Sequence, residues 1–129
     1  MASANTILVV DDDPLVRATI VSALLELGYL TGEAADGEAA LAALRGAEPP
    51  SLVILDYVMP GMDGAEVARE IAAFDPDLPV VFSTGHAALR ALRAAAGDDA
   101  AVLEKPFTLD ELDALLRERL TERRRVRSA

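Results

Sequence analysis

The stretch ILVVDDDP, residues 7–14, contains a complete transition from a strand to a helix. Residues 7–10 are apolar, partly β-branched and not alternating, which is typical of a strand buried on both faces of a sheet. Asp13 followed by Pro14 has the order of a helix N-cap and a first helical residue. This stretch therefore predicts a parallel strand, two carboxylates (Asp11 and Asp12) at its carboxyl end, and a helix that begins at once.

The same alternation continues along the whole chain. Further strands are expected at residues 52–55, 80–82 and 101–103, with a weaker edge strand at 29–34. Helices are expected at residues 14–27, 38–45 and 86–96, with one more starting near Asp63 and a last one at a capping box of Thr108 and Glu111. Alternating strands and helices predict an α/β fold, a doubly wound (βα)5 arrangement with a five-stranded parallel sheet in the order 2-1-3-4-5.

Three of these helices have an apolar side that we expect to face the sheet. The predicted anchors are Leu15, Val16, Ile20, Ala23, Leu24 and Leu27 in the first helix, Val67, Ile71 and Phe74 in the third, and Leu109, Leu112, Leu116 and Leu120 in the fifth. The fourth helix is rich in alanine and has few large side chains. We expect it to be the most loosely anchored.

The bulk composition indicates one domain and excludes several classes of protein. The chain has 129 residues and is expected to form a single domain (1–129), with a core at about residues 5–122 and a basic tail at 123–129 that frays. The absence of cysteine excludes disulfides and thiolate sites. A net charge of −10 disfavours direct binding to nucleic acid, and RRR at 123–125 is better explained as a helix end. No apolar run approaches the ~18 residues that span a membrane, and no secretory signal is visible, so a cytoplasmic protein is expected.

Polar residues follow each of the strongly apolar strands, and the carboxyl ends of parallel strands meet at one edge of the sheet. These residues are Asp11 and Asp12, Asp56, Ser83 and Thr84, and Glu104 and Lys105, the last being the one lysine beside eleven arginines. Carboxylates brought together repel one another unless one is protonated or a cation lies among them. Without cysteine, Mg²⁺ is the natural cation for such a site. Asp56 would then attack a phosphoryl group, Lys105 would neutralise its oxygens and Thr84 would donate a hydrogen bond.

Over residues 5–122 the sequence resembles the receiver domains of two-component response regulators. The matching motifs are ILVVDDDP, LVILDYVMPGMDG, VVFSTGH and VLEKPF, in the order and spacing of that family. The resemblance implies that Asp56 is the phosphoacceptor and that Thr84 and Lys105 contact the phosphoryl group. It implies a Mg²⁺ site made by Asp11, Asp12, Asp56 and the backbone carbonyl of Val58. It also implies a cis peptide bond between Lys105 and Pro106.

The same resemblance implies partners and a way of tuning the signal. The phosphoryl donor would be a sensor histidine kinase or a histidine phosphotransfer protein, and a downstream protein would bind the face of the fourth helix, fifth strand and fifth helix. A weak homodimer is left open. The side chains two places after Asp56 and Thr84, which are Val58 and His86, are hypothesised to set the phosphoryl lifetime. The family's usual switch aromatic is replaced by Val102, so we expect the loop after Thr84 or the fourth helix to report phosphorylation instead.

Two other functions compete with a phosphorelay signalling module. An aspartate-nucleophile phosphatase of the haloacid-dehalogenase type would carry a second aspartate two residues after Asp56, where this chain has Val58. A phosphorylation-independent adaptor of the same fold would have lost site residues, and none is lost here. We therefore expect a signalling domain rather than a turnover enzyme, either stand-alone or cut from a larger regulator or hybrid kinase.

Overall fold

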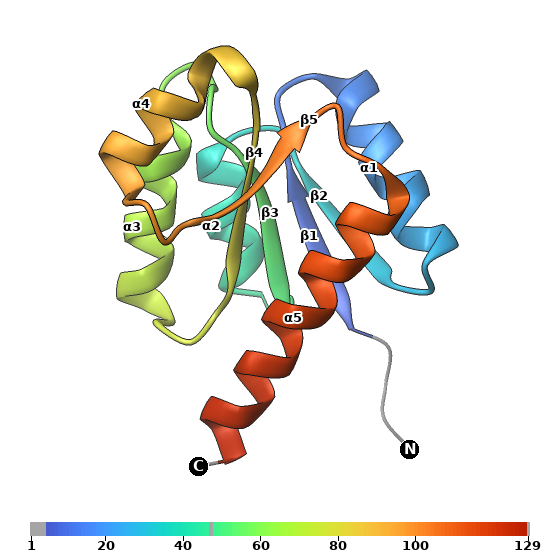
Figure 1. Cartoon of the computed structure of the whole chain (residues 1–129). Helices are drawn as coiled ribbons and strands as arrows, with labels where there is room; N and C mark the ends of the chain where they lie inside the picture. Colours follow the sequence, from blue (N-terminus) through green and yellow to red (C-terminus); the bar gives the residue numbers. More distant parts are fainter. Residues whose placement is uncertain (1–4, 47, 129) are drawn as a thin grey trace.

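The computed structural model of the chain describes residues 5–46 and 48–128, with side chains up to residue 123. Five parallel strands form one sheet in the order β2-β1-β3-β4-β5, which confirms the predicted fold and strand order (Figure 1). The strands are β1 (Thr6–Val10), β2 (Leu30–Ala34), β3 (Leu52–Asp56), β4 (Val80–Gly85) and β5 (Ala101–Lys105). The helices are α1 (Pro14–Glu26), α2 (Gly37–Leu44), α3 (Gly64–Phe74), α4 (His86–Ala96) and α5 (Leu109–Ser128).

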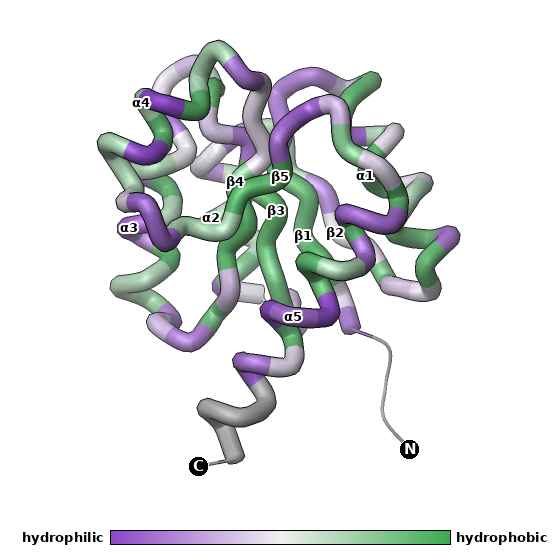
Figure 2. Tube along the Cα trace, in the orientation of Figure 1, coloured by the Kyte–Doolittle hydropathy of each residue, from purple (hydrophilic) through white to green (hydrophobic). Residues whose placement is uncertain are grey.

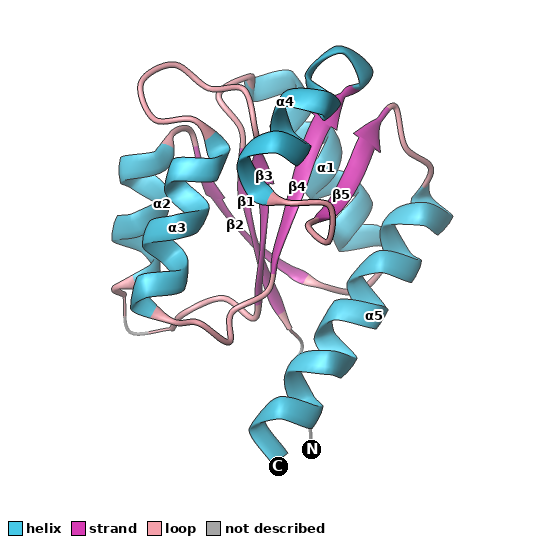
Figure 3. Cartoon of the chain, turned by 60° about the vertical axis from the view of Figure 1, so that its left-hand side comes forward, coloured by secondary structure: helices cyan, strands magenta, loops and turns pink. Residues whose placement is uncertain are grey.

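The sheet separates two apolar layers, because successive side chains of a strand point to opposite faces. In β1, Leu8 and Val10 pack with side chains of α2, α3 and α4. Ile7 and Val9 pack with side chains of α1 and α5 on the other face. Figure 3 shows α2 and α3 on one side of the sheet and α5 on the other, and Figure 2 shows that the central strands are the most hydrophobic segments.

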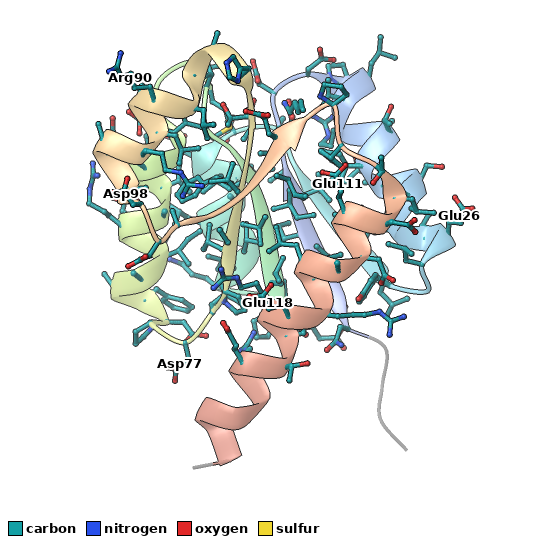
Figure 4. The ribbon with its side chains drawn as sticks, viewed as in Figure 1. Glu26, Asp77, Arg90, Asp98, Glu111 and Glu118 are labelled. Atoms are coloured by element: carbon teal, nitrogen blue, oxygen red, sulfur yellow. The ribbon has the colours of Figure 1, made fainter. Side chains whose placement is uncertain are left out.

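Charged side chains cover the outside of the helices and loops. Glu26, Asp77, Arg90, Asp98, Glu111 and Glu118 are all exposed and are labelled in Figure 4. Within the described part of the chain, none of the helices is both apolar enough and long enough to pass through a membrane.

Short polar side chains begin four of the helices, as the sequence predicts for three of them. Asp13 accepts a hydrogen bond from the backbone N–H of Leu15 (2.9 Å), and Asp63 accepts one from Glu66 (2.9 Å). Thr108 and Glu111 form the expected reciprocal capping box. The fourth cap, Asp36, places the start of α2 slightly earlier than the pattern predicts. Each cap satisfies a backbone N–H that the helix itself cannot pair.

Three of the predicted core anchors are wrong. Leu15 is 79% exposed, Phe74 56% and Leu109 37%. All three lie in the first or last turn of their helices. A five-residue strand spans about 17 Å, whereas α1 and α5, with thirteen and twenty residues, span about 20 and 30 Å, so their end turns reach past the sheet that would cover them. Helix α3 is no longer than a strand, and Phe74 is exposed as its last residue.

Arg123, the first residue of the predicted tail, contacts the body of the protein. The helix continues to Ser128. The Arg123 guanidinium donates a hydrogen bond to the Ser51 carbonyl (2.6 Å) and lies 3.8 Å from a carboxylate oxygen of Asp75. This arginine therefore fastens α5 to the loop before β3, while the side chains of Arg124 and Arg125 lie outside the described residues.

The start of α3 lies unusually close to the end of β3. The backbone N–H of Gly64 donates a hydrogen bond to the Tyr57 carbonyl (2.8 Å). A Cβ atom added at Gly64 would lie 2.7 Å from the Asp56 carbonyl oxygen and 2.7 Å from the Tyr57 Cα. Both are backbone atoms with little freedom to move. Because Gly64 has no side chain, the start of α3 can lie directly against the strand end that carries Asp56.

We predict that Gly64→Ala destabilises the protein by about 1–3 kcal/mol, because the added methyl group must displace backbone. The matched control is Gly32→Ala in β2, where the added Cβ would meet only the Leu8 side chain, at an ordinary 3.5 Å. Urea unfolding of both variants measures the difference. An equal effect of the two substitutions would contradict a specific close approach at Gly64.

Candidate functional site

Three carboxylates meet at the carboxyl edge of the sheet. Asp11 follows β1 and Asp56 ends β3, and these two strands are neighbours at the centre of the sheet. One carboxylate oxygen from each of Asp11, Asp12 and Asp56 lies within 4.8 Å of the other two. Asp11 is 1% exposed and Asp56 7%, whereas Asp12 is exposed. Two of the three carboxylates are therefore buried at the base of the site, and the third, Asp12, lies at its solvent-exposed opening.

Lys105 brings a positive charge to the two buried carboxylates from the edge strand β5. Its ammonium lies 3.3 Å from Asp11 Oδ2 and 3.6 Å from Asp56 Oδ1. Because β4 lies between β3 and β5, the long lysine side chain spans the end of a whole strand. The Lys105–Pro106 peptide bond is cis, the isomer that the resemblance implies.

Neighbouring backbone groups hold Asp11 in place. Its Oδ1 accepts a hydrogen bond from the backbone N–H of Asp13 (2.9 Å). Its backbone carbonyl accepts one from Arg17 (2.6 Å), whose guanidinium also pairs with Glu33 (3.0 Å). Asp13 itself caps α1, as predicted, and is not one of the three clustered carboxylates.

Burial and charge together raise the pKa of Asp56 from 3.8 to about 6. Loss of hydration on burial is the largest cause, and the negative charges of Asp11 and Asp12 add to it. The Lys105 ammonium and a hydrogen bond from the Val58 backbone N–H act in the opposite direction and lower it. The single positive charge of Lys105 does not compensate the negative charges of Asp11 and Asp12 together with the loss of hydration, so the pKa of Asp56 stays raised.

The donor set suits a small hard cation. It consists of carboxylate oxygens alone, and the three carboxylates and one ammonium leave an excess of negative charge. Mg²⁺ and Ca²⁺ are bound through oxygen, and Mg²⁺ is commonly held by one or two carboxylates together with water and phosphate oxygens. A divalent cation among Asp11, Asp12 and Asp56 would remove the repulsion that the protein otherwise carries here.

The other predicted site residues lie around this cluster rather than within it. Thr84 is 1% exposed, and its hydroxyl donates to the Gly85 carbonyl (3.3 Å) instead of contacting Asp56. His86 lies at the rim with its Nδ1 3.1 Å from a Glu104 carboxylate oxygen. The Val58 side chain is 60% exposed. The structure thus brings Asp11, Asp12, Asp56 and Lys105 together and leaves Thr84, Val58 and His86 beside them.

Two features of the site escaped the sequence analysis. The first is the pairing of His86 with Glu104, which only the alignment of β4 and β5 reveals. The second is Ser83, a buried hydroxyl in register with Asp56 on the neighbouring strand. Ser83 was visible as a polar residue at the end of an apolar strand, but the sequence does not say which face of the sheet it occupies.

Val102, at the position where the resemblance leads one to expect an aromatic ring, is half-buried. It packs against the apolar layer that contains Phe82 and Leu92. Gly85 precedes α4 and supplies no side chain to cap it, and Leu92 is the fully buried residue of that helix. The α4 segment is therefore held by few strong contacts.

Comparison with known proteins gives one consistent result. A family model described as the response regulator receiver domain matches residues 7–117. The chain is 44% identical over 108 residues to the response regulator receiver protein CpdR of Brucella abortus, a match that covers 82% of this chain and 88% of CpdR. It is 38% identical to the C4-dicarboxylate transport transcriptional regulatory protein DctD of Rhizobium meliloti, covering 98% of this chain but 27% of DctD.

Solved structures agree with this match. The crystal structure of a response regulator receiver protein from Sinorhizobium medicae superposes with a TM-score of 0.83 at 32% identity, covering 94% of this chain and 98% of that one. The chain therefore corresponds in length to CpdR and to this receiver protein, but to only about a quarter of DctD.

The raised pKa of Asp56 predicts a pH-dependent stability in the presence of a metal chelator. As the pH rises from about 4 to about 6, the unfolded chain ionises this carboxyl before the folded protein does, so the folded protein loses stability. A shift of about two units corresponds to about 3 kcal/mol, fully expressed above about pH 6. Asp56→Asn should lack this loss and be the more stable protein at pH 7.5, with the difference shrinking toward pH 4.

Urea unfolding at several pH values measures this, and Asp99→Asn, which changes an exposed carboxylate before β5, is the matched control. Parallel stability profiles for Asp56→Asn and wild type would contradict the raised pKa.

Proposed function

Because the chain belongs to the response regulator receiver family, a family of signalling modules rather than turnover enzymes, we propose that it accepts a phosphoryl group on Asp56 in a phosphorelay. The observation that carries the proposal is the position of Asp56, buried at the end of a central strand between two other carboxylates and the Lys105 ammonium. The donor would be a phosphohistidine on a sensor kinase or on a histidine phosphotransfer protein.

The proposed reaction exchanges one phosphorus bond for another. An oxygen of the ionised Asp56 carboxylate attacks the phosphorus, the P–N bond of the phosphohistidine breaks, and its electron pair returns to the imidazole of the donor. The product is an acyl phosphate on Asp56. Since Asp56 must be ionised to attack, groups that favour its charged form also favour the reaction, and the Lys105 ammonium has the largest effect of these.

Mg²⁺ is the proposed cofactor, and Asp11, Asp12 and Asp56 are the carboxylates that would hold it, together with the backbone carbonyl of Val58. The three-carboxylate cluster is typical of a receiver magnesium site. When bound, the ion supplies positive charge to the carboxylates and to the phosphoryl oxygens. Lys105 would bind a phosphoryl oxygen as well, which requires its ammonium to give up part of its contact with Asp11.

Thr84 is the proposed partner of another phosphoryl oxygen. Its hydroxyl must leave the Gly85 carbonyl to reach that position. Gly85 permits such a movement, because a glycine backbone has few steric limits. The residues that follow belong to the weakly anchored α4, so the movement can spread along the helix without breaking large apolar contacts.

The proposed output surface consists of α4, β5 and α5, where a downstream protein would bind. Val102 lies on β5 in this surface and has no ring that could swing between two positions. We therefore assign the report of phosphorylation to the backbone directly after Thr84, where β4 passes into α4 at Gly85 without an intervening loop, and to α4 itself. A cytoplasmic location and the alternatives of a stand-alone regulator or a part of a longer one belong to the same proposal, as does a weak homodimer.

The phosphoacceptor role predicts a gain in mass. Wild-type protein incubated with Mg²⁺ and acetyl phosphate should gain one phosphoryl group in intact-mass measurements, and a chelator of Mg²⁺ should abolish the gain. Asp56→Asn should gain none. Asp63→Asn is the matched control, because Asp63 caps α3 outside the cluster and asparagine is an equally good cap. Wild-type protein that stays unmodified would favour the adaptor function instead.

The position of His86 predicts a change in phosphoryl lifetime. The pairing with Glu104 holds its ring at the rim of the site, where it would shield the acyl phosphate from water. His86→Ala should therefore speed the loss of the phosphoryl group by about threefold, a barrier change of under 1 kcal/mol. The rate is measured after removal of acetyl phosphate, and Arg90→Ala, one turn further along α4, is the control. An unchanged rate of phosphoryl loss in His86→Ala would contradict the hypothesis that His86 sets the phosphoryl lifetime.

A further inference from the structure

Ser83 is a buried polar residue whose position no role described so far explains. The residue is 1% exposed, and its hydroxyl oxygen has no hydrogen-bond partner among the described residues. A buried hydroxyl without a partner typically costs about 1–3 kcal/mol. An alanine would avoid that cost at a position surrounded by β-sheet. The serine hydroxyl therefore needs a reason other than stability.

Its place in the sheet points to Asp56. The register of β3 and β4 pairs Ser83 directly with Asp56, and that of β4 and β5 pairs it with Leu103. Neighbouring strands lie about 4.8 Å apart, and side chains in register point to the same face. Ile54 and Val81, two residues earlier on each strand, both belong to the apolar layer of α1 and α5. Ser83 and Asp56 therefore lie side by side on that face.

The Asp56 carboxylate has room for a further hydrogen bond. An ionised carboxylate has about four lone-pair positions. Asp56 receives one hydrogen bond from the Val58 backbone N–H and has the Lys105 ammonium at 3.6 Å. A serine hydroxyl rotates among three staggered positions and donates one hydrogen bond. Rotation about χ1 is the movement that would bring the Ser83 hydroxyl to its neighbour.

We propose that Ser83 is a positioning residue for the nucleophile, a role that rests on the proposed function. Its hydroxyl donates a hydrogen bond to one oxygen of the Asp56 carboxylate once the other oxygen is engaged by the divalent cation or by phosphorus. The bond fixes the plane of the carboxylate at the floor of the site. Hydrogen bonds from neighbouring groups orient metal-binding carboxylates in this way, and losing one commonly lowers metal affinity by about 10–100-fold.

Ser83 and Thr84 have separate tasks in this arrangement. Successive residues of a strand point to opposite faces, and Phe82, two residues before Thr84, belongs to the layer of α2, α3 and α4. Thr84 thus approaches the site from the side of α4 and would bind the phosphoryl group. Ser83 approaches from the side of α1 and α5 and would bind the carboxylate that carries it.

The test compares Ser83→Ala and Ser83→Thr with wild type in three measurements. With chelator present, the free energy of unfolding of Ser83→Ala should equal or exceed that of wild type. The Mg²⁺ dissociation constant, measured by calorimetry, should rise about tenfold in Ser83→Ala. The initial rate of phosphorylation by acetyl phosphate at saturating Mg²⁺ should fall about tenfold. Ser83→Thr retains the hydroxyl and should restore most of both losses.

Val81→Ala is the packing control, since it removes buried atoms from the same strand and the same face. It should lower stability and leave Mg²⁺ affinity and phosphorylation rate near wild type. A loss of affinity or rate in Ser83→Ala that Ser83→Thr reverses supports the proposal. Three results would overturn it. The first is a Ser83→Ala protein with wild-type Mg²⁺ affinity and phosphorylation rate, and the second is a loss that Ser83→Thr does not reverse. The third is wild-type protein that binds no Mg²⁺. If wild type binds Mg²⁺ but takes up no phosphoryl group, the proposed function fails, and the Mg²⁺ affinities still decide the role of Ser83.

Discussion

The contact of the Lys105 ammonium with Asp11 and Asp56 is the interaction on which the rest of the site depends. Both carboxylates are buried at the ends of neighbouring strands, and their repulsion would oppose the central pairing of the sheet. A lysine suits this place better than an arginine, because a compact ammonium on a flexible stem can contact two separate carboxylates, whereas a planar guanidinium favours bidentate pairing with one. It comes from β5, so the charge that offsets the carboxylates at the centre of the sheet depends on the pairing of an edge strand.

The site is kept at the expense of stability. Asp56 is held above its ordinary pKa, Ser83 has a buried hydroxyl without a partner, and Gly64 gives up a side chain so that α3 can approach. Each feature is unfavourable by itself. The two apolar layers on either side of the sheet compensate for them, since they bury almost every large side chain of the three central strands. Functional sites commonly depart from the local rules that the rest of a fold obeys.

The helices are anchored to the sheet unevenly, so α4 can move more easily than α1 and α5. Helices α1 and α5 contribute several fully buried side chains to their layer, whereas α4 contributes Leu92 and has no side-chain cap. The junction at Gly85, where β4 passes directly into α4, is therefore the segment with the fewest contacts to hold it against movement. Under the proposed function, a backbone response at this junction would take the place of a ring movement, because β5 carries Val102.

The sequence by itself determined the strand order, the caps at Asp13, Asp63 and Thr108, and the acidic and basic residues at the strand ends. These follow from local patterns: apolar runs, short polar residues at helix starts, and the rule that parallel strands end at one edge. Only the tertiary structure decided that Leu15, Phe74 and Leu109 are exposed, that His86 meets Glu104, and that Ser83 lies beside Asp56. The physical reason is that these facts depend on where the ends of a helix lie relative to the sheet and on the register between strands, and neither is encoded within the segment that carries the residue.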